Sequence, residues 1–274
     1  MLITLTSDIG RKDYMLGAVK GLLLKANYDF RIADITHEIS PFNFPQAAYI
    51  CSNAVKYFPD NTFHIILVNL FDKRPDHLLL AYHNNQYYAC ADNGLLTMIL
   101  GSKPEKVAAI LLDKTVQKDT LYCVSVFAKA IADVVAGKTL EQLGDTSINI
   151  VEKNPLKPML GPNWMEGQII FIDNFENVVV NITREEFEEQ RKGRSFKIIF
   201  KRDEVIEKMS ETYADVAEGD KLAIFNAAGY LEIAINKGNA AGLFGLQGFS
   251  EKQLQQNPAL RNRPYYQTVR IQFD

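Results

Sequence analysis

The sequence predicts an α/β domain followed by a mostly β domain. In roughly the first 150 residues, apolar runs of strand length alternate with stretches of helical periodicity. Beyond a proline-rich stretch, nearly every apolar run has the length and spacing of a strand. A chain of 274 residues is also long for one typical domain and suits two. We therefore expect an α/β domain at 1–152, a linker at 153–164 and a barrel-like β domain at 165–274.

Strands and helices are expected to alternate through the first domain. The expected strands are 2–6, 30–35, 63–70, 78–83, 86–91 and 107–112, and the expected helices are 13–25, 44–58 and 124–136. Asn84-Asn85 between two of these strands indicates a hairpin, and the near-continuous apolar run at 63–70 is typical of a strand covered on both faces. The alternation predicts a largely parallel sheet.

Short apolar runs dominate the second domain. The expected strands are 167–173, 178–182, 196–200, 221–225, 231–235 and 265–273, with one charged helix at 184–192. Before them, Asn154-Pro155 and Gly161-Pro162 interrupt strand formation and predict a stiff linker. A cleft between two unlike domains is a common place for a ligand.

Composition and charge exclude several classes of protein. A net charge of −3 gives no electrostatic footprint for nucleic acid. No apolar run reaches the roughly 18 residues of a membrane span, and Met1 leads directly into a strand rather than a signal peptide. The three cysteines are widely spaced in apolar surroundings, as in reduced proteins. We expect a cytoplasmic protein with no nucleic-acid or membrane partner.

Two acid-bearing turns are the candidate ligand site. Asp8 follows the first strand, where it either caps the helix expected at Asp13 or accepts hydrogen bonds from a ribose diol. Asp173, Phe175 and Asn177 follow a later strand; they fit a hairpin turn, but also the stacking and edge hydrogen bonds that hold a nucleobase. If the two turns meet in space, they frame a site for a nucleoside.

Other polar motifs favour structural roles. The Thr36–Pro41 stretch, with His37, suits a loop held by side-chain hydrogen bonds, and Asp92-Asn93-Gly94 suits a tight turn. The histidines lack metal-ligand spacing, so we expect no metal and no cofactor. The absence of Walker, GxGxxG and GxSxG motifs argues against triphosphatase, Rossmann dehydrogenase and α/β-hydrolase chemistry.

The order of these motifs resembles the S-adenosylmethionine hydroxide adenosyltransferase family, which includes fluorinating and chlorinating enzymes. The opening Thr6-Ser7-Asp8-Ile9-Gly10, with Asp13, Gly17 and Lys20-Gly21 after it, is similar to that family's TDFG…D…G…KG pattern. The resemblance continues in order to about residue 245 through four further segments: Asp34–Pro41, Asp92–Leu96, Ile172–Ile182 and Gly229–Ala234.

The resemblance implies an N-terminal α/β domain, a C-terminal barrel-like domain and a homotrimer whose sites lie between subunits. It implies that Asp8 binds the ribose hydroxyls and that Phe42 lines the sugar. It also implies that Asp173 faces the methionine ammonium group, while Phe175 and Asn177 hold adenine. The implied reaction is displacement at the ribose C5′ carbon, in which methionine leaves from the sulfonium. A sulfonium leaves readily, so the protein mainly has to position and desolvate the nucleophile.

The chain departs from the family where water is activated. Hydroxide-forming members carry an Asp-Pro-Gly-Val-Gly segment ending in Arg, and a His before Gly-Arg-Asp. Here Asn69 stands at the Asp position and Tyr122 at the His position, and Arg74 or His77 could substitute for the missing groups. Neither an amide nor a phenol is a strong base, so we interpret Asn69 and Tyr122 as catalytic-site residues that position the nucleophile.

The leading hypothesis is an enzyme that cleaves S-adenosylmethionine with water or hydroxide into adenosine and methionine, as a metal-independent adenosyltransferase-like hydrolase. One alternative is a sensor or scaffold that kept the adenosine site and lost the chemistry. Another is an enzyme that uses a different nucleophile, such as halide. In each case the partner is a small molecule.

Overall fold

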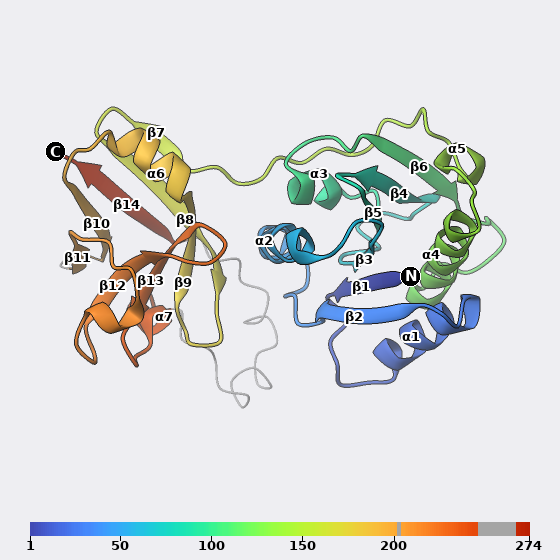
Figure 1. The fold of residues 1–274 in the computed structure, drawn as a ribbon, viewed down its shortest axis with the longest axis horizontal. Coiled ribbons are helices and arrows are strands. Elements are labelled where there is room, and N and C mark those ends of the chain that lie inside the picture. Colours follow the sequence, from blue (N-terminus) through green and yellow to red (C-terminus); the bar gives the residue numbers. More distant parts are fainter. Residues whose placement is uncertain (202–203, 246–266) are drawn as a thin grey trace. The chain divides into compact units, whose positions relative to one another are not determined.

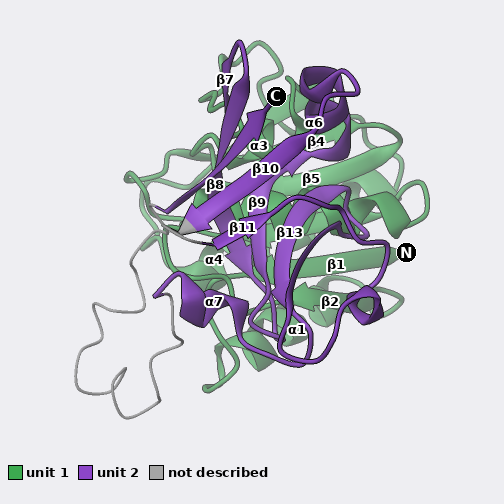
Figure 2. Cartoon of the chain, turned by 90° about the vertical axis from the view of Figure 1, so that its left-hand side faces the viewer, with its two compact units in different colours: residues 1–155 green, residues 156–274 purple. Residues whose placement is uncertain are grey.

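The computed structural model describes residues 1–201, 204–245 and 267–274. The chain forms two compact units, Met1–Pro155 and Leu156–Asp274 (Figure 2). We describe each unit by itself.

A six-stranded sheet forms the centre of the first unit (Figure 1). Its strands are β1 (Leu2–Ser7), β2 (Arg31–Thr36), β3 (Phe63–Leu67), β4 (His77–His83), β5 (Gln86–Cys90) and β6 (Lys106–Leu111). They lie in the order β2-β1-β3-β5-β4-β6. β4 alone runs opposite to the other five strands, because a short hairpin joins it to β5. The expectation of a largely parallel sheet is confirmed.

Helices cover both faces of this sheet, as the buried strands require. The helices are α1 (Met15–Ala26), α2 (Phe44–Ala54), α3 (Leu95–Leu100), α4 (Thr120–Val135) and α5 (Leu140–Leu143), and a 3₁₀ turn at Val55–Tyr57 follows α2. One core contains Val19 of α1 and Phe127 of α4, and a second core contains Ala47 of α2 and Leu96 of α3. The unit is therefore a three-layer α/β fold (Figure 1).

Two helix starts differ from expectation for local reasons. The first helix begins at Met15 rather than Asp13, and the Asp13 Oδ1 atom accepts a hydrogen bond from the Met15 N–H at 2.9 Å. The helix expected from about residue 124 begins at Thr120, because the Asp119 side chain caps it by accepting from the Tyr122 N–H at 2.8 Å. The second difference places Tyr122 in the first turn of α4.

An antiparallel, nearly closed sheet forms the second unit. Its strands are β7 (Met159–Gly161), β8 (Trp164–Ile172), β9 (Val178–Thr183), β10 (Phe196–Lys201), β11 (Glu204–Ile206), β12 (Lys221–Phe225), β13 (Tyr230–Ile235) and β14 (Thr268–Phe273). The main path is β11-β10-β14-β8-β9-β13-β12. The ends of the path approach each other after β11, where the Ser210 N–H donates to the Ala223 carbonyl at 2.8 Å. The barrel-like expectation is confirmed.

The described residues of the second unit also form three shorter helical segments: α6 (Arg184–Arg191), a 3₁₀ turn at Tyr213–Asp215 and α7 (Ala240–Leu243). The core contains Met165 and Ile271 from strands and Phe187 from α6, all essentially inaccessible to solvent. The expected strand at 265–273 is present as β14, and its first two expected residues lie outside the described residues.

Part of the expected linker is structured. Met159–Gly161 forms β7 and pairs antiparallel with β8, from Met159 opposite Glu166 to Gly161 opposite Trp164. Pro162 and Asn163, which suggested a strand-breaking linker, instead make the turn between the two strands. None of the helices among the described residues is long and apolar enough to span a bilayer.

Candidate functional site

Polar residues collect at one edge of the parallel sheet in the first unit. Asp8 follows β1, Asn69 follows β3 and Asp92 follows β5. Parallel strands end at a common edge, and His77 joins that edge because it begins the antiparallel strand β4. The sequence-predicted residues Asp8 and Asn69 thus lie where α/β sheets usually bind ligands.

Asp8 and Asn69 are in direct contact. The Asp8 Oδ2 atom accepts a hydrogen bond from the Asn69 N–H at 2.9 Å, and the Asp8 N–H donates to the Leu67 carbonyl at 3.2 Å. Asn69 has a left-handed backbone, with φ of 47°, which Asn tolerates better than most residues. Burial raises the pKa of Asp8, and the Asn69 N–H offsets part of that rise. No other described residue donates to Asp8 Oδ1, so that oxygen can accept from a ligand.

Asn93 ties the end of β3 to the start of α3. Its Nδ2 donates to the carbonyls of Val68 at 3.1 Å and Asn69 at 3.0 Å, and its Oδ1 accepts from the Leu95 N–H at 3.0 Å. Asn93 is 4% exposed and precedes Gly94, whose φ is 89°. This agrees with the structural role expected of the motif, and it fixes the backbone that contacts Asp8.

His77 and Asp92 form a second contact at the same edge. The His77 Nε2 atom lies 3.1 Å from Asp92 Oδ2, while Asp92 Oδ1 accepts from the Val151 N–H at 2.7 Å. No hydrogen-bond partner of His77 Nδ1 is found among the described residues. An imidazole can exchange protons with a ligand or water when one of its nitrogens contacts a carboxylate and the other is available for a hydrogen bond.

A Ser, a His and an Asp side chain contact one another in series near this edge. The Ser7 Oγ and His37 Nδ1 atoms are 2.7 Å apart, His37 Nε2 is 3.2 Å from Asp34 Oδ1, and Lys20 Nζ is 2.7 Å from Asp34 Oδ2. The order suggests a catalytic triad, but Ser7 and His37 are each 1% exposed, so a substrate cannot reach the hydroxyl. These side-chain contacts hold the loop after β2, which agrees with the structural role expected for His37.

Phe42 is exposed on a strained loop between β2 and α2. It has φ of 64° and is 69% exposed, an unusual combination for a bulky residue. The next residue, Asn43, caps α2 by accepting from the Gln46 N–H at 3.1 Å. Strain of this kind is frequent at ligand-binding loops.

Tyr122 supports the loop between β6 and α4. Its hydroxyl oxygen accepts a hydrogen bond from the Asp113 N–H at 2.8 Å. The hydroxyl keeps its own proton, and no acceptor for that proton is found among the described residues. Tyr122 itself is partly buried against the core of the first unit.

Asp173 organises the turn between β8 and β9 in the second unit. Its Oδ1 accepts from the N–H groups of Phe175 and Asn177, both at 2.8 Å, and its Oδ2 accepts from Asn177 Nδ2 at 3.0 Å. Asn177 is 4% exposed, whereas Phe175 is 75% exposed. The turn thus brings these three predicted residues together and presents an aromatic ring to solvent.

Glu232 was missed by the sequence reasoning. It lies on β13, is 3% exposed, and accepts from the Tyr213 hydroxyl at 2.6 Å and from Asn226 Nδ2 at 3.3 Å. Burial raises the pKa of Glu232, and the charge of Asp173 raises it further. A charged residue in the middle of the apolar run Leu231–Ile235 was the available signal.

Glu232→Gln is expected to make the melting temperature less dependent on pH. The folded-state pKa of Glu232 is raised, so its contribution to stability is fully present below the unfolded pKa and is lost as pH rises through the folded pKa. Gln carries no charge, and its single side-chain oxygen can still accept from the Tyr213 hydroxyl, whereas the hydrogen bond from Asn226 Nδ2 is lost. Thermal melting between pH 4 and 8 measures this, with Glu207→Gln, an exposed change, as the control. If the melting temperatures of the wild type and of Glu232→Gln changed in parallel with pH, the prediction would be contradicted.

Comparison with known proteins agrees with this architecture. The model of the SAM hydroxide adenosyltransferase N-terminal domain matches residues 3–144, and that of the C-terminal domain matches residues 167–252. The chain is 26% identical to an (R)-S-adenosyl-L-methionine hydrolase of Methanocaldococcus jannaschii, over 92% of this chain and 95% of that protein. It is 23% identical to a fluorinase of Actinopolyspora mzabensis, over 90% and 94% of the two chains.

A solved structure has the same fold. The crystal structure of an uncharacterized conserved protein from Thermotoga maritima gives a TM-score of 0.80 at 24% identity, over 99% of both chains. The chain is thus a two-unit protein with an α/β unit and an antiparallel barrel-like unit. It belongs to the SAM hydroxide adenosyltransferase family.

Proposed function

We propose that this protein cleaves S-adenosylmethionine with water, giving adenosine and methionine. A water oxygen forms a bond to the ribose C5′ carbon, the C5′–S bond breaks, and its electron pair stays on sulfur. The water proton passes to solvent. Family membership and the (R)-S-adenosyl-L-methionine hydrolase of M. jannaschii support this reaction.

The Asp8 carboxylate is the observation that carries the proposal. One of its oxygens is fixed by the Asn69 N–H, and the other accepts nothing from the described residues. A carboxylate held in this way at the carboxyl edge of a parallel sheet is suited to accept hydrogen bonds from a ribose diol. Phe42, on the loop after the neighbouring strand, would line the sugar.

Asn69 and Tyr122 would position the attacking water. Asn69 Nδ2 donates to Asp72 Oδ1 at 3.0 Å, which leaves Asn69 Oδ1 as an acceptor for a water proton. Tyr122 accepts from the Asp113 N–H and so has its own proton to donate. Neither group needs to be a strong base, because the sulfonium is already a good leaving group. His77, beside Asp92, offers this edge an imidazole through which the released proton can pass on its way to solvent.

The second unit would hold the adenine and the methionine ammonium group. Phe175 offers an exposed ring for stacking, and Asp173 and Asn177 shape the turn that carries it. We further propose that the working form is a homotrimer, in which units of neighbouring copies share each substrate. The three cysteines are free, buried thiols, which supports a reducing compartment such as the cytoplasm. Light scattering of the purified protein tests the trimer.

Incubation with S-adenosylmethionine in ¹⁸O-labelled water tests the reaction. We expect adenosine and methionine in equal amounts by chromatography, with one ¹⁸O atom in the 5′-hydroxyl of adenosine. Thermal stabilisation by S-adenosylmethionine without any product would instead support a sensor or scaffold. Loss of adenosine in favour of a halogenated nucleoside when halide is added would identify a different nucleophile.

A further inference from the structure

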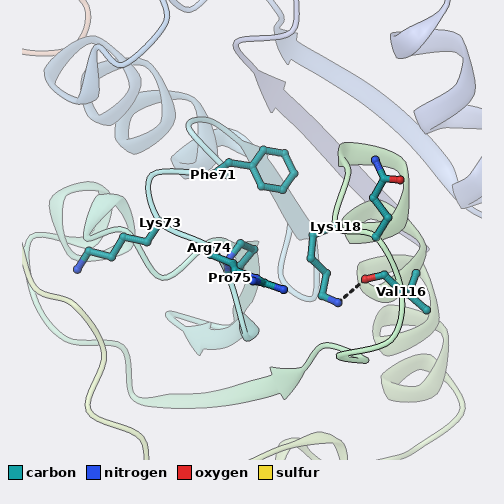
Figure 3. Close-up of a pocket in the computed structure, with 7 residues that line it drawn as sticks. Phe71, Lys73, Arg74, Pro75, Val116 and Lys118 are labelled. Carbon is teal, nitrogen blue, oxygen red and sulfur yellow. Dashed lines mark hydrogen bonds between the residues drawn. The ribbon is translucent and has the colours of Figure 1, made fainter.

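A pocket of about 420 Å³ lies between two loops of the first unit (Figure 3). Phe71 and Arg74-Pro75 of the β3–β4 loop form one side, and residues 116–118 of the β6–α4 loop form the other. The volume exceeds what a single water molecule or halide ion needs. Phe71, Pro75 and Val116 supply apolar surface within it.

The charged residues that line this pocket are all cationic: Lys73, Arg74 and Lys118. In Figure 3 the Lys118 ammonium group is directed at the Val116 carbonyl, the Arg74 side chain lies on the opposite wall of the pocket, and the Lys73 side chain points away from both. Cations on both walls of one pocket give it a positive potential that favours an anion. This one-sided charge is the first indication that the pocket binds an anion.

Both cations keep donors available for a ligand. Lys118 Nζ donates to the carbonyls of Asp113 and Val116, which orients the ammonium group and leaves it one further N–H. Arg74 makes no hydrogen bond or ion pair in the part of the chain that the structure describes, so its planar guanidinium has its full set of donors. A guanidinium and an ammonium group that line one pocket can donate to the oxygens of a carboxylate or phosphate.

The two loops are fixed at their bases. The β3–β4 loop begins at Asn69, which Asp8 and Asn93 hold, and ends at Asp76, whose carbonyl accepts from the Leu112 N–H at 2.8 Å. The β6–α4 loop is held by the hydrogen bond between Asp113 and Tyr122. The pocket walls are therefore preorganised, which lowers the entropic cost of binding a ligand.

We propose that this pocket binds a small organic oxyanion, a carboxylate or a phosphate monoester. Arg74 and Lys118 bind the anionic group, and Phe71, Pro75 and Val116 contact the organic part. Asn69 and Tyr122, the two residues expected beside the nucleophile, stand at the bases of the pocket walls. Occupancy of the pocket is measured without S-adenosylmethionine, so the proposal stands or falls independently of the cleavage reaction.

Calorimetric titration of the full chain tests the proposal with inorganic phosphate, phenyl phosphate and benzoate at constant ionic strength. We expect saturable binding, with phenyl phosphate or benzoate tighter than inorganic phosphate because the ring adds apolar contact. The tighter of the two organic anions identifies whether a phosphate or a carboxylate suits the pocket.

Arg74→Ala should weaken this binding roughly tenfold or more, because it removes charge-assisted hydrogen bonds. Lys73→Ala is the matched control, because it removes a cation from the same loop. The Lys73 side chain points away from Arg74 and Lys118, so this change should affect the affinity much less. Saturable binding that both variants weaken equally would indicate general electrostatic attraction and overturn the proposal, as would the absence of saturable binding in the wild type. Thermal melting establishes that both variants are folded.

Discussion

Asp8→Ala is expected to lower kcat/KM for S-adenosylmethionine by at least about 100-fold. Hydrogen bonds to a charged group contribute about 1.5–3 kcal/mol each, and the carboxylate would accept two from the ribose diol. The change also removes the acceptor of the Asn69 N–H, which holds the start of the β3–β4 loop. Steady-state kinetics, with adenosine measured by chromatography, gives the ratio.

Two variants separate binding from folding. Asp29→Ala removes an exposed carboxylate that makes no hydrogen bond or ion pair among the described residues, and it should leave kcat/KM unchanged. Asp8→Asn keeps an acceptor for the Asn69 N–H and loses the charge, so it should remain folded and poorly active. An Asp8→Ala enzyme that is folded and retains wild-type kcat/KM would refute the assignment of Asp8 to the ribose.

The raised pKa of Asp8 also predicts the acid limb of the pH profile. The ionised form is the better ribose acceptor, so kcat/KM should fall as pH decreases through the raised pKa, starting at a higher pH than an ordinary aspartate would give. Stability has the opposite dependence: the stability Asp8 contributes is present below its unfolded pKa and is lost as pH rises through the folded pKa. At neutral pH, Asp8→Asn should therefore melt no lower than the wild type.

The layered fold of the first unit could be predicted because each strand has a recognisable local pattern of apolar residues. The apolar runs around Phe63 and Leu80 are too continuous for half-exposed strands, and the alternation with helices then implies a parallel sheet. Boundaries were less predictable, since they depend on single capping side chains. Asp119, for example, starts α4 before the apolar periodicity begins.

Contacts between distant segments could not be predicted from local patterns. The Asp8 and Asn69 contact joins residues 61 positions apart, and it depends on β1 and β3 being neighbours in the sheet. The pocket beside Arg74 likewise depends on two loops that follow different strands. Local patterns did find the turn at Asp173, because its donors and acceptor lie within five consecutive residues.

Phe175→Ala is expected to raise KM for S-adenosylmethionine roughly tenfold while leaving the melting temperature unchanged. Stacking of a base on an aromatic side chain contributes about 1–3 kcal/mol. The ring is 75% exposed, and the turn is held by the Phe175 backbone N–H rather than its side chain. Steady-state kinetics and thermal melting measure the two quantities. Tyr28→Ala, which removes an aromatic ring that is 91% exposed and outside the candidate site, is the matched control.

Asp173→Ala separates the shape of the turn from the ring it presents. It removes the acceptor of three hydrogen bonds, so it should lower the free energy of unfolding by about 1–3 kcal/mol and also raise KM. If Phe175→Ala destabilised the protein as much as Asp173→Ala, the ring would be a packing residue. If it left KM unchanged, adenine would have to bind elsewhere. A rise in KM without loss of stability is the combination expected of a ligand contact, because the Phe175 ring is 75% exposed and makes no ring contact among the described residues.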